Sequence, residues 1–225
     1  MTKTWAIILA AGREQQLESG ADSLFLGVGS KPLLAYSLMA LQECVDVDRV
    51  VVCAPPGREE AVRMVAQRYG CSKLKAVPTG GATMSSILPI ALAAFEEDVR
   101  WVVIQELCRP CITSARTSTV VRTARRTGNA VAAGASREVC YLAESKDRFR
   151  RLGSGAVVEV RSPRAYTRDV LESAVEAARR RRARWTDEVE IVEREVERLH
   201  FVDSGGVDVR IRTADDLALA ASFLR

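Results

Sequence analysis

The chain has 225 residues, of which 48% are hydrophobic and 28% are charged, and these proportions are ordinary for a globular protein. They exclude a disordered, collagen-like or coiled-coil chain, and no apolar run reaches the roughly 18 residues of a membrane span. The 33 basic and 29 acidic residues give a net charge of only +4, which is too small to require a nucleic-acid partner. We therefore expect a soluble, cytoplasmic protein that binds neither nucleic acid nor membrane.

Strand-like and helix-like segments alternate along the whole chain. Apolar runs predict buried strands at residues 5–10, 49–54, 74–77, 101–105 and 129–133. Amphipathic patterns and capping residues predict helices at 32–44, 58–69, from Gly81 to about 97, 113–127 and 167–184. Toward the C-terminus the pattern predicts a helix capped near 186–188, short strands at 198–202 and 207–211, and a helix at 213–224. This alternation predicts one α/β domain over residues 1–225, with a doubly wound, mostly parallel sheet.

One segment departs from the alternation. Between residues 136 and 164 the periodicity weakens, which indicates a protruding β-arm.

Ligands of doubly wound sheets bind beyond the carboxyl ends of the strands. The loops at 11–31, 78–86 and 105–112 follow strands at that edge, so we expect them to form one site.

Six cysteines and a single histidine restrict the available chemistry. His200 lies in an apolar segment, which favours a structural role. Cys108 and Cys111 have the C-x-x-C spacing that redox and zinc sites share. No second C-x-x-C and no pair of histidines accompanies them, so a coincidental spacing in a loop is the favoured interpretation.

An ordered set of short motifs resembles one enzyme family. The first strand ends in Leu9-Ala10-Ala11-Gly12, which is similar to the opening of nucleotidyltransferases that act on sugar and alcohol phosphates. Further similar motifs are Gly29-Ser30-Lys31-Pro32-Leu33-Leu34, Gly80-Gly81, Cys108-Arg109-Pro110, Thr186-Asp187-Glu188, Asp208-Val209-Arg210-Ile211 and Asp215-Asp216-Leu217-Ala218-Leu219-Ala220. In this order they resemble the 2-C-methyl-D-erythritol 4-phosphate cytidylyltransferase family over nearly the whole chain.

The resemblance implies a nucleotidyltransferase, Rossmann-like fold and a reaction. CTP and a sugar-alcohol phosphate would give a CDP-alcohol and pyrophosphate, with Mg²⁺ as cofactor. A Gly-rich loop would surround the triphosphate with backbone N–H groups. The members of this family form homodimers through the β-arm, so the resemblance also implies that residues 136–164 serve dimerisation.

The resemblance also implies site residues. The nucleotide-binding set is Ala10, Ala11, Gly12, Gly80, Gly81 and Ser86, and the substrate-binding set is Glu106, Arg109, Thr186 and Asp187. Arg13 and Arg210 are the candidate catalytic cations, and Glu106 is also the candidate Mg²⁺ ligand, because carboxylates suit that ion. The alternatives are pairing of Glu106 or Arg109 within a salt bridge, and a simple helix cap at 186–187.

Several positions depart from the family pattern. Its second loop Gly, its loop Arg, the following Lys and the Arg after the Gly pair fall on Glu14, Gln16, Ser23 and Met84. The family's His-Asp falls on Gln105-Glu106, and a later Lys falls on Arg210. Glu14 would repel a triphosphate, and each missing transition-state cation costs about 10²- to 10³-fold in rate.

Two functions follow from the pattern and its departures. The first is a divergent cytidylyltransferase of the non-mevalonate isoprenoid pathway, or a close relative with another base or acceptor. The second is a catalytically silent homodimer with a binding or regulatory role.

Overall fold

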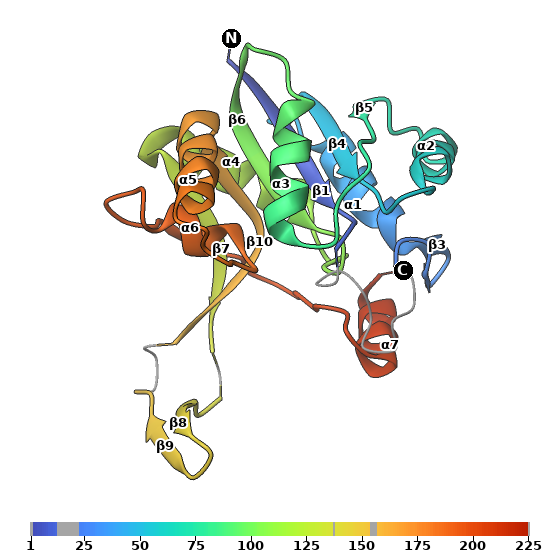
Figure 1. Cartoon of the computed structure of the whole chain (residues 1–225). Coiled ribbons are helices and arrows are strands. Elements are labelled where there is room, and N and C mark those ends of the chain that lie inside the picture. The colour runs from blue at the N-terminus through green and yellow to red at the C-terminus, as the bar shows by residue number, and fades with distance from the viewer. Residues whose placement is uncertain (1, 13–22, 137, 154–156, 225) are drawn as a thin grey trace.

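A computed structural model of the chain describes residues 2–12, 23–136, 138–153 and 157–224. Its centre is a seven-stranded sheet in the order β11-β7-β10-β6-β1-β4-β5 (Figure 1). The strands are β1 (Lys3–Leu9), β4 (Arg49–Cys53), β5 (Leu74–Ala76), β6 (Val99–Glu106), β7 (Asn129–Ala135), β10 (Val158–Thr167) and β11 (Phe201–Asp203). Neighbours pair in parallel except β10, which is antiparallel to both β6 and β7.

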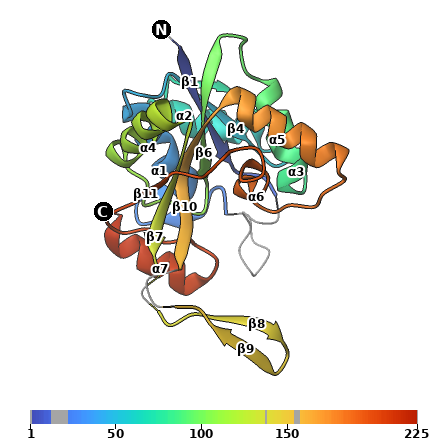
Figure 2. The same ribbon diagram turned by 90° about the vertical axis from the view of Figure 1, so that its left-hand side faces the viewer.

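Helices cover both faces of this sheet, which makes the central strands nearly continuous apolar runs. The helices are α1 (Leu33–Glu43), α2 (Glu59–Arg68), α3 (Met84–Ala93), α4 (Ser114–Thr127), α5 (Arg168–Arg180), α6 (Glu188–Val192) and α7 (Ala214–Phe223). Figure 2 shows α1 and α4 on one face and α3 and α5 on the other. Two buried clusters, one on each face, form the core. The doubly wound α/β fold predicted from the sequence is thus confirmed.

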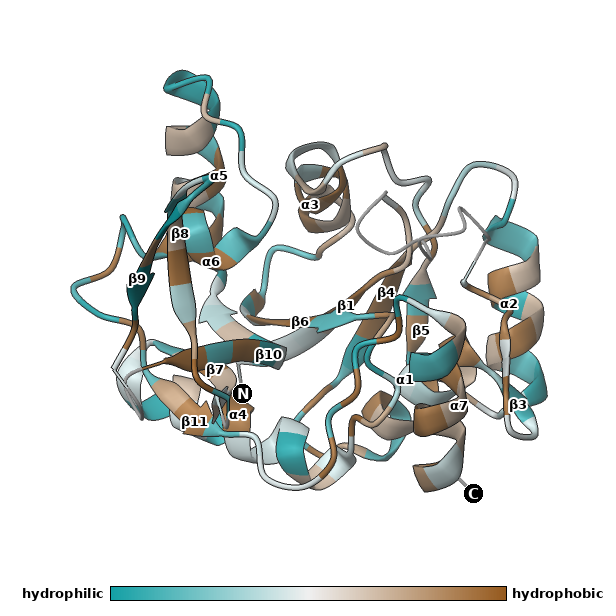
Figure 3. Cartoon of the chain, turned by 90° about the horizontal axis from the view of Figure 1, so that it is seen from below, coloured by the Kyte–Doolittle hydropathy of each residue, from teal (hydrophilic) through white to brown (hydrophobic). Residues whose placement is uncertain are grey.

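The arm is a two-stranded hairpin between the C-terminal end of β7 and the N-terminal end of β10. Its strands are β8 (Tyr141–Ser145) and β9 (Arg148–Arg151), and the hairpin projects away from the rest of the molecule (Figures 1 and 2). Seen from below, β9 is strongly hydrophilic (Figure 3). The predicted arm extends too far at its C-terminal end, because Arg164 pairs with Ile104 in the central sheet.

Three local predictions are wrong. Residues 207–211, predicted as a strand, have no strand pairing. The loop predicted at 11–31 contains a small hairpin, in which β2 (Gly27–Val28) pairs with β3 (Lys31–Pro32). Pro32 precedes α1 as its N-cap and is not its first helical residue.

Among the described residues, no helix is both long enough and apolar enough to cross a bilayer.

Candidate functional site

The first half of the candidate site is the turn that follows β1. The backbone N–H of Ala10 donates to the carbonyl of Cys53 on β4, with an N···O distance of 3.1 Å. Gly12 then has a φ of 94°, a left-handed conformation that favours glycine. The chain therefore turns sharply at the carboxyl edge of the sheet, where the sequence predicted a ligand loop.

The Gly80-Gly81 turn packs directly against this loop. The backbone N–H of Gly80 donates to the carbonyl of Ala54 at 2.8 Å. A Cβ atom on Gly80 would lie 2.5 Å from the Cβ of Ala11, and one on Gly81 would overlap the hydroxyl of Ser86. Both positions therefore require glycine, and four predicted nucleotide-binding residues are brought together.

Ser86 has a structural role at the start of α3. Its hydroxyl donates to the carbonyl of Thr83 at 2.8 Å and accepts from the Thr83 backbone N–H at 3.2 Å. The bond from the Thr83 N–H is one half of a capping box, and the other half is the Thr83 side chain accepting from the backbone N–H of Ser86. The cap holds the Gly80-Gly81 turn and the first turn of α3 in one rigid unit.

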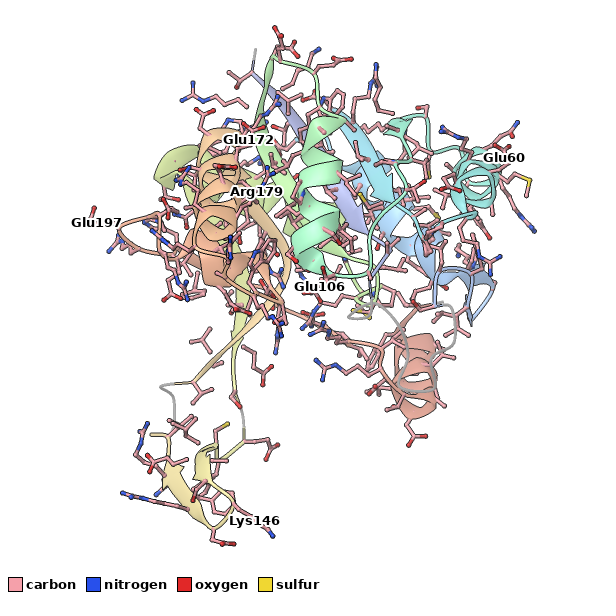
Figure 4. The ribbon with its side chains drawn as sticks, in the orientation of Figure 1. Glu60, Glu106, Lys146, Glu172, Arg179 and Glu197 are labelled. Carbon is pink, nitrogen blue, oxygen red and sulfur yellow. The ribbon has the colours of Figure 1, made fainter. Side chains whose placement is uncertain are left out.

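The second half of the candidate site is an ionic cluster centred on Glu106, at the carboxyl end of β6 (Figure 4). The residue is 2% exposed. Its Oε2 atom accepts from Nε of Arg109 at 3.0 Å and lies 3.5 Å from Nε of Arg210, while Oε1 accepts from Arg164. Burial alone would raise the pKa of Glu106, but these three guanidinium groups lower it to about 2.

Arg164 connects this carboxylate to α6. Its side chain lies on β10 and is 1% exposed. Nη1 donates to both carboxylate oxygens of Glu188, at 2.8 and 2.9 Å, and Nη2 lies 3.0 Å from Oδ2 of Asp187. Burial raises the pKa of Glu188 to about 7, although Arg164 beside it favours the charged form.

Asp208 supplies a further carboxylate, on the irregular segment between β11 and α7. Its Oδ1 atom lies 3.1 Å from Nη1 of Arg109, and Oδ2 lies 3.7 Å from Nε of Arg161. Arg116 on α4 holds this segment in place, because its Nη2 donates to the carbonyls of Gly205 and Val207 at 2.6 and 3.1 Å. The segment 207–211 is thus held at its start by side-chain hydrogen bonds and not by the strand pairing that the sequence predicted.

Comparison with known proteins decides the family. The sequence matches the family described as IspD, 2-C-methyl-D-erythritol 4-phosphate cytidylyltransferase, over residues 4–225. The chain belongs to this family. Curated relatives with that enzyme name come from Lysinibacillus sphaericus, at 25% identity over 97% of this chain and 94% of the relative, and from Pelotomaculum thermopropionicum, at 26% over 100% and 95%.

Solved structures of the same family have the same fold. The cytidylyltransferase of Thermus thermophilus has a TM-score of 0.79 and 25% identity, and covers 98% of both chains. The 4-diphosphocytidyl-2C-methyl-D-erythritol synthase of Anaerococcus prevotii has a TM-score of 0.87 at 18% identity, covering 99% of this chain and 98% of that one. The second likeness is evidence for the fold alone.

Residues predicted on the acceptor side from the family resemblance have local roles here. Asp187 caps α6 by accepting from the backbone N–H of Val189 at 2.9 Å. The exposed Thr186 hydroxyl donates to Glu190 at 2.9 Å. Arg109 is paired with both Glu106 and Asp208, which is the salt-bridge alternative left open by the sequence. The geometry therefore brings Glu106, Arg109, Asp187 and Arg210 into one cluster and leaves Thr186 at its edge.

The carboxylates of the cluster are already paired with arginine side chains. Glu106, Asp187, Glu188 and Asp208 each face at least one guanidinium group. Within the described ranges, no three His, Cys, Asp or Glu side chains are grouped so that they could hold a metal ion. Glu106 is instead the Arg-paired carboxylate of the alternative interpretation.

The departures from the family pattern fall partly outside the described residues. Arg13, Glu14 and Gln16 lie in the range 13–22, which the structure does not describe. Ser23 and Met84, which stand where the family has Lys and Arg, are each 4% exposed. Met84 belongs to the core beneath α3.

The sequence reasoning missed Arg161, Arg164, Glu188 and Asp208 as parts of the cluster. Arg164 lies between Arg161 and Arg168 in the sequence, so no local signal marks it as the buried cation of the three. The two cysteines of the C-x-x-C spacing lie in the buried part of the same loop. Cys108 and Cys111 are buried and not disulfide-bonded, and burial raises the pKa of Cys108 to about 11.

Proposed function

We propose that this protein is a divergent cytidylyltransferase that joins CTP to 2-C-methyl-D-erythritol 4-phosphate and releases pyrophosphate. Family membership over residues 4–225 supports the reaction class. The observation that carries the proposal is the close packing of Gly80 on Ala11, which keeps the two nucleotide loops of the family together at the carboxyl edge of the sheet.

The nucleotide would lie along Ala10, Ala11, Gly12, Gly80, Gly81 and Ser86. The N–H groups of Ala10 and Gly80 are already bonded to Cys53 and Ala54, so the phosphate oxygens would be bound by those of Gly12 and Gly81. The phosphorylated acceptor would lie beside the ionic cluster, near Thr186 and Asp187. There Arg109 and Arg210 have side chains that are 12% and 28% exposed and can present their remaining N–H groups to a phosphate.

The transfer step forms one bond and breaks one. An oxygen of the acceptor phosphate attacks the α-phosphorus of CTP, and the bond from that phosphorus to the bridging oxygen of pyrophosphate breaks. Negative charge builds on the α-phosphate oxygens during the step, and cations aimed at that point lower the barrier. Arg13 and Arg210 are the candidates for this role, and with Ser23 and Met84 supplying no charge we expect a slow reaction.

A second candidate function is the catalytically silent homodimer, and one observation favours it. The four arginines of the cluster, Arg109, Arg161, Arg164 and Arg210, face the four carboxylates of Glu106, Asp187, Glu188 and Asp208. The acceptor side is therefore nearly neutral before any phosphate arrives. A site with its charges already paired gains less from binding an anion.

We also propose that residues 1–225 act as one nucleotidyltransferase-like domain and that the arm joins two copies into a homodimer. Tyr141 and Phe149 on the hairpin are 56% and 61% exposed. A two-stranded hairpin is marginally stable by itself, and a partner surface would cover these rings.

The deciding experiment measures pyrophosphate release from CTP and 2-C-methyl-D-erythritol 4-phosphate in the presence of Mg²⁺. We expect slow, acceptor-dependent release that is reduced at least about 10²-fold by Arg109→Met. Arg122→Met is the matched control, because Arg122 forms a surface pair with Asp46 away from the site. Absence of release would overturn the cytidylyltransferase proposal, and a dimer that releases no pyrophosphate would support the silent homodimer.

A further inference from the structure

Arg164 is the most deeply buried cation among the described residues that belong to the cluster, with 1% of its surface exposed. We propose that Arg164 is a positioning residue: it fixes the carboxylate of Glu106 and, through that carboxylate, the two rim guanidinium groups of Arg109 and Arg210. This inference rests on the proposed function, because the rim arginines matter for catalysis only if a phosphorylated acceptor binds beside them.

The donor atoms of Arg164 are all engaged, and they join three segments of the chain. Nε donates to the carbonyl of Arg161 at 2.9 Å on the same strand. Nη1 donates to both oxygens of Glu188 on α6, and Nη2 faces Glu106 at the end of β6 and Asp187 at the α6 cap. A planar guanidinium is suited to such multiple contacts, because its N–H groups have a fixed geometry.

These contacts divide the two oxygens of Glu106 between different partners. Oε1 is taken by Arg164, so Oε2 alone faces the rim, where it meets Nε of Arg109 and Nε of Arg210. Without the Arg164 contact, the carboxylate would lose the hydrogen bond that fixes its plane. Arg109 and Arg210 would then lose their common anchor.

The same anchor reaches the segment that carries Arg210. Arg109 also pairs with Asp208, and the backbone N–H of Ile211 donates to the carbonyl of Cys108 at 2.8 Å. The segment 207–211 has no strand pairing of its own; Arg116 fixes its start through the carbonyls of Gly205 and Val207, and these contacts fix its end. The buried guanidinium thus acts on the two side chains, Arg109 and Arg210, that these segments present at the rim.

A substitution of Arg164 alone would leave the buried Glu188 without its partner and would lower stability. A loss of activity could then come from unfolding as well as from misplaced rim side chains. The informative variant is therefore Arg164→Met combined with Glu188→Met, since replacing a buried ion pair by apolar side chains is often neutral for stability. Asp187 is left without the arginine, but its side chain is 32% exposed and can be hydrated. The matched control is Arg168→Met with Glu172→Met, which removes a surface pair with a 2.7 Å N···O distance from α5.

We expect the buried double variant to keep a melting temperature close to that of the parent, while the KM for 2-C-methyl-D-erythritol 4-phosphate rises at least about 10-fold, because misplaced binding groups are costly. The KM for CTP should change much less. Arg164→Lys keeps the charge but loses the planar guanidinium group. Its KM for 2-C-methyl-D-erythritol 4-phosphate should therefore lie between that of the parent and that of the double variant. An unchanged acceptor KM in a folded double variant overturns the inference and leaves the proposed function intact.

Amide hydrogen exchange gives a second readout that does not need turnover. The backbone N–H groups of Arg109 and Ile211 should exchange at least about 10-fold faster in the buried double variant, while Leu107, whose N–H donates to the carbonyl of Leu9, serves as the reference. If the parent releases no pyrophosphate, the proposed function fails but this comparison still decides the positioning role. Equal exchange at Arg109 and Ile211 in parent and double variant overturns it. If the double variant fails to fold, the same comparison is made on Arg164→Lys, with the same two outcomes.

Discussion

Gly80 lies so close to Ala11 that a Cβ atom on the glycine would be 2.5 Å from the Cβ of the alanine. Neither atom is at the end of a flexible side chain, so any added group must displace a backbone segment. The two residues belong to loops that follow β1 and β5, which are separated by β4 in the sheet. Their contact sets the distance between the two nucleotide loops.

Gly80→Ala should therefore move these loops apart. We expect the free energy of unfolding to fall by about 1–3 kcal/mol, as in other overpacked sites, and CTP binding measured by calorimetry to weaken at least about 10-fold. Gly27→Ala is the matched control, because a Cβ atom on Gly27 meets nothing within 4 Å. Equal CTP affinities for the two variants would show that the contact does not shape the nucleotide site.

The first half of the candidate site could be placed at the edge of the sheet from local features, whereas its assignment to nucleotide binding came from the family resemblance. Buried runs such as residues 5–10 identify parallel strands, and glycines after such strands mark the turns where ligands bind. Ser86 follows within one turn of Gly81. These signals act over a few residues, and the structure brings Ala11, Gly80, Gly81 and Ser86 together as predicted.

The family resemblance named four residues of the ionic half, but their pairing could not be predicted, because the partners are distant in sequence. Arg164 pairs with Glu106, 58 residues earlier, and with Glu188, 24 residues later. Sequence patterns give no register for such contacts. The apolar alternation at 207–211 is typical of a strand. In the structure, however, the Arg116 side chain donates hydrogen bonds to the carbonyls of Gly205 and Val207, and the segment does not pair with a strand.

Glu188 should make stability depend on pH in an unusual direction. Its pKa rises from an ordinary value of 4.5 to about 7 in the folded protein, first because of burial and despite the attraction of Arg164. The folded state therefore holds this proton more tightly than the unfolded state, which adds stability below about pH 4.5 and loses it as the pH rises through about 7. The pKa of Glu106 is lowered to about 2, so its contribution is lost only in stronger acid.

We expect the unfolding free energy of the parent to lose about 3 kcal/mol between pH 4.5 and 7.5 relative to Glu188→Gln. Denaturant unfolding at a series of pH values measures this difference, and the comparison cancels the titration of all other groups. Tyr166 and Asp187 also face Glu188 and are unchanged in the variant. Parallel curves for the two proteins would show that Arg164 keeps Glu188 ionised throughout.

The proposed homodimer should depend on the exposed rings of the arm. Tyr141 pairs with Arg151 and Ala143 pairs with Phe149, which places Tyr141 and Phe149 on the same face of the hairpin. Tyr141→Ser with Phe149→Ser should convert a dimer into a monomer in light scattering at micromolar concentration. Met64→Ser is the control, because Met64 is 59% exposed on α2, away from the arm. A monomeric parent would refute the dimer directly.

The departures from the family pattern predict that restored cations should restore activity. Glu14→Gly removes a carboxylate that repels the triphosphate, and Gln16→Arg with Ser23→Lys returns two cations to the positions where the family has them. Because Ser23 is 4% exposed, the new lysine must extend past its neighbours to place its charge at the surface. Pyrophosphate release by this triple variant should exceed that of the parent at least ~10²-fold.

Met84→Arg completes the family pattern but has a structural cost. Met84 is 4% exposed and packs in the core under α3, so an arginine there must displace its neighbours or remain unpaired. We therefore expect the quadruple variant to melt at a lower temperature than the triple variant and to gain further activity only if the arginine reaches the nucleotide pocket.

The control for both rescue variants is Gln67→Arg with Ser72→Lys, which adds two cations at exposed positions away from the site. A parent that already turns over at ~1–10³ s⁻¹ would contradict the loss of transfer chemistry, and a folded but inactive quadruple variant would locate the remaining defect in the ionic cluster around Glu106.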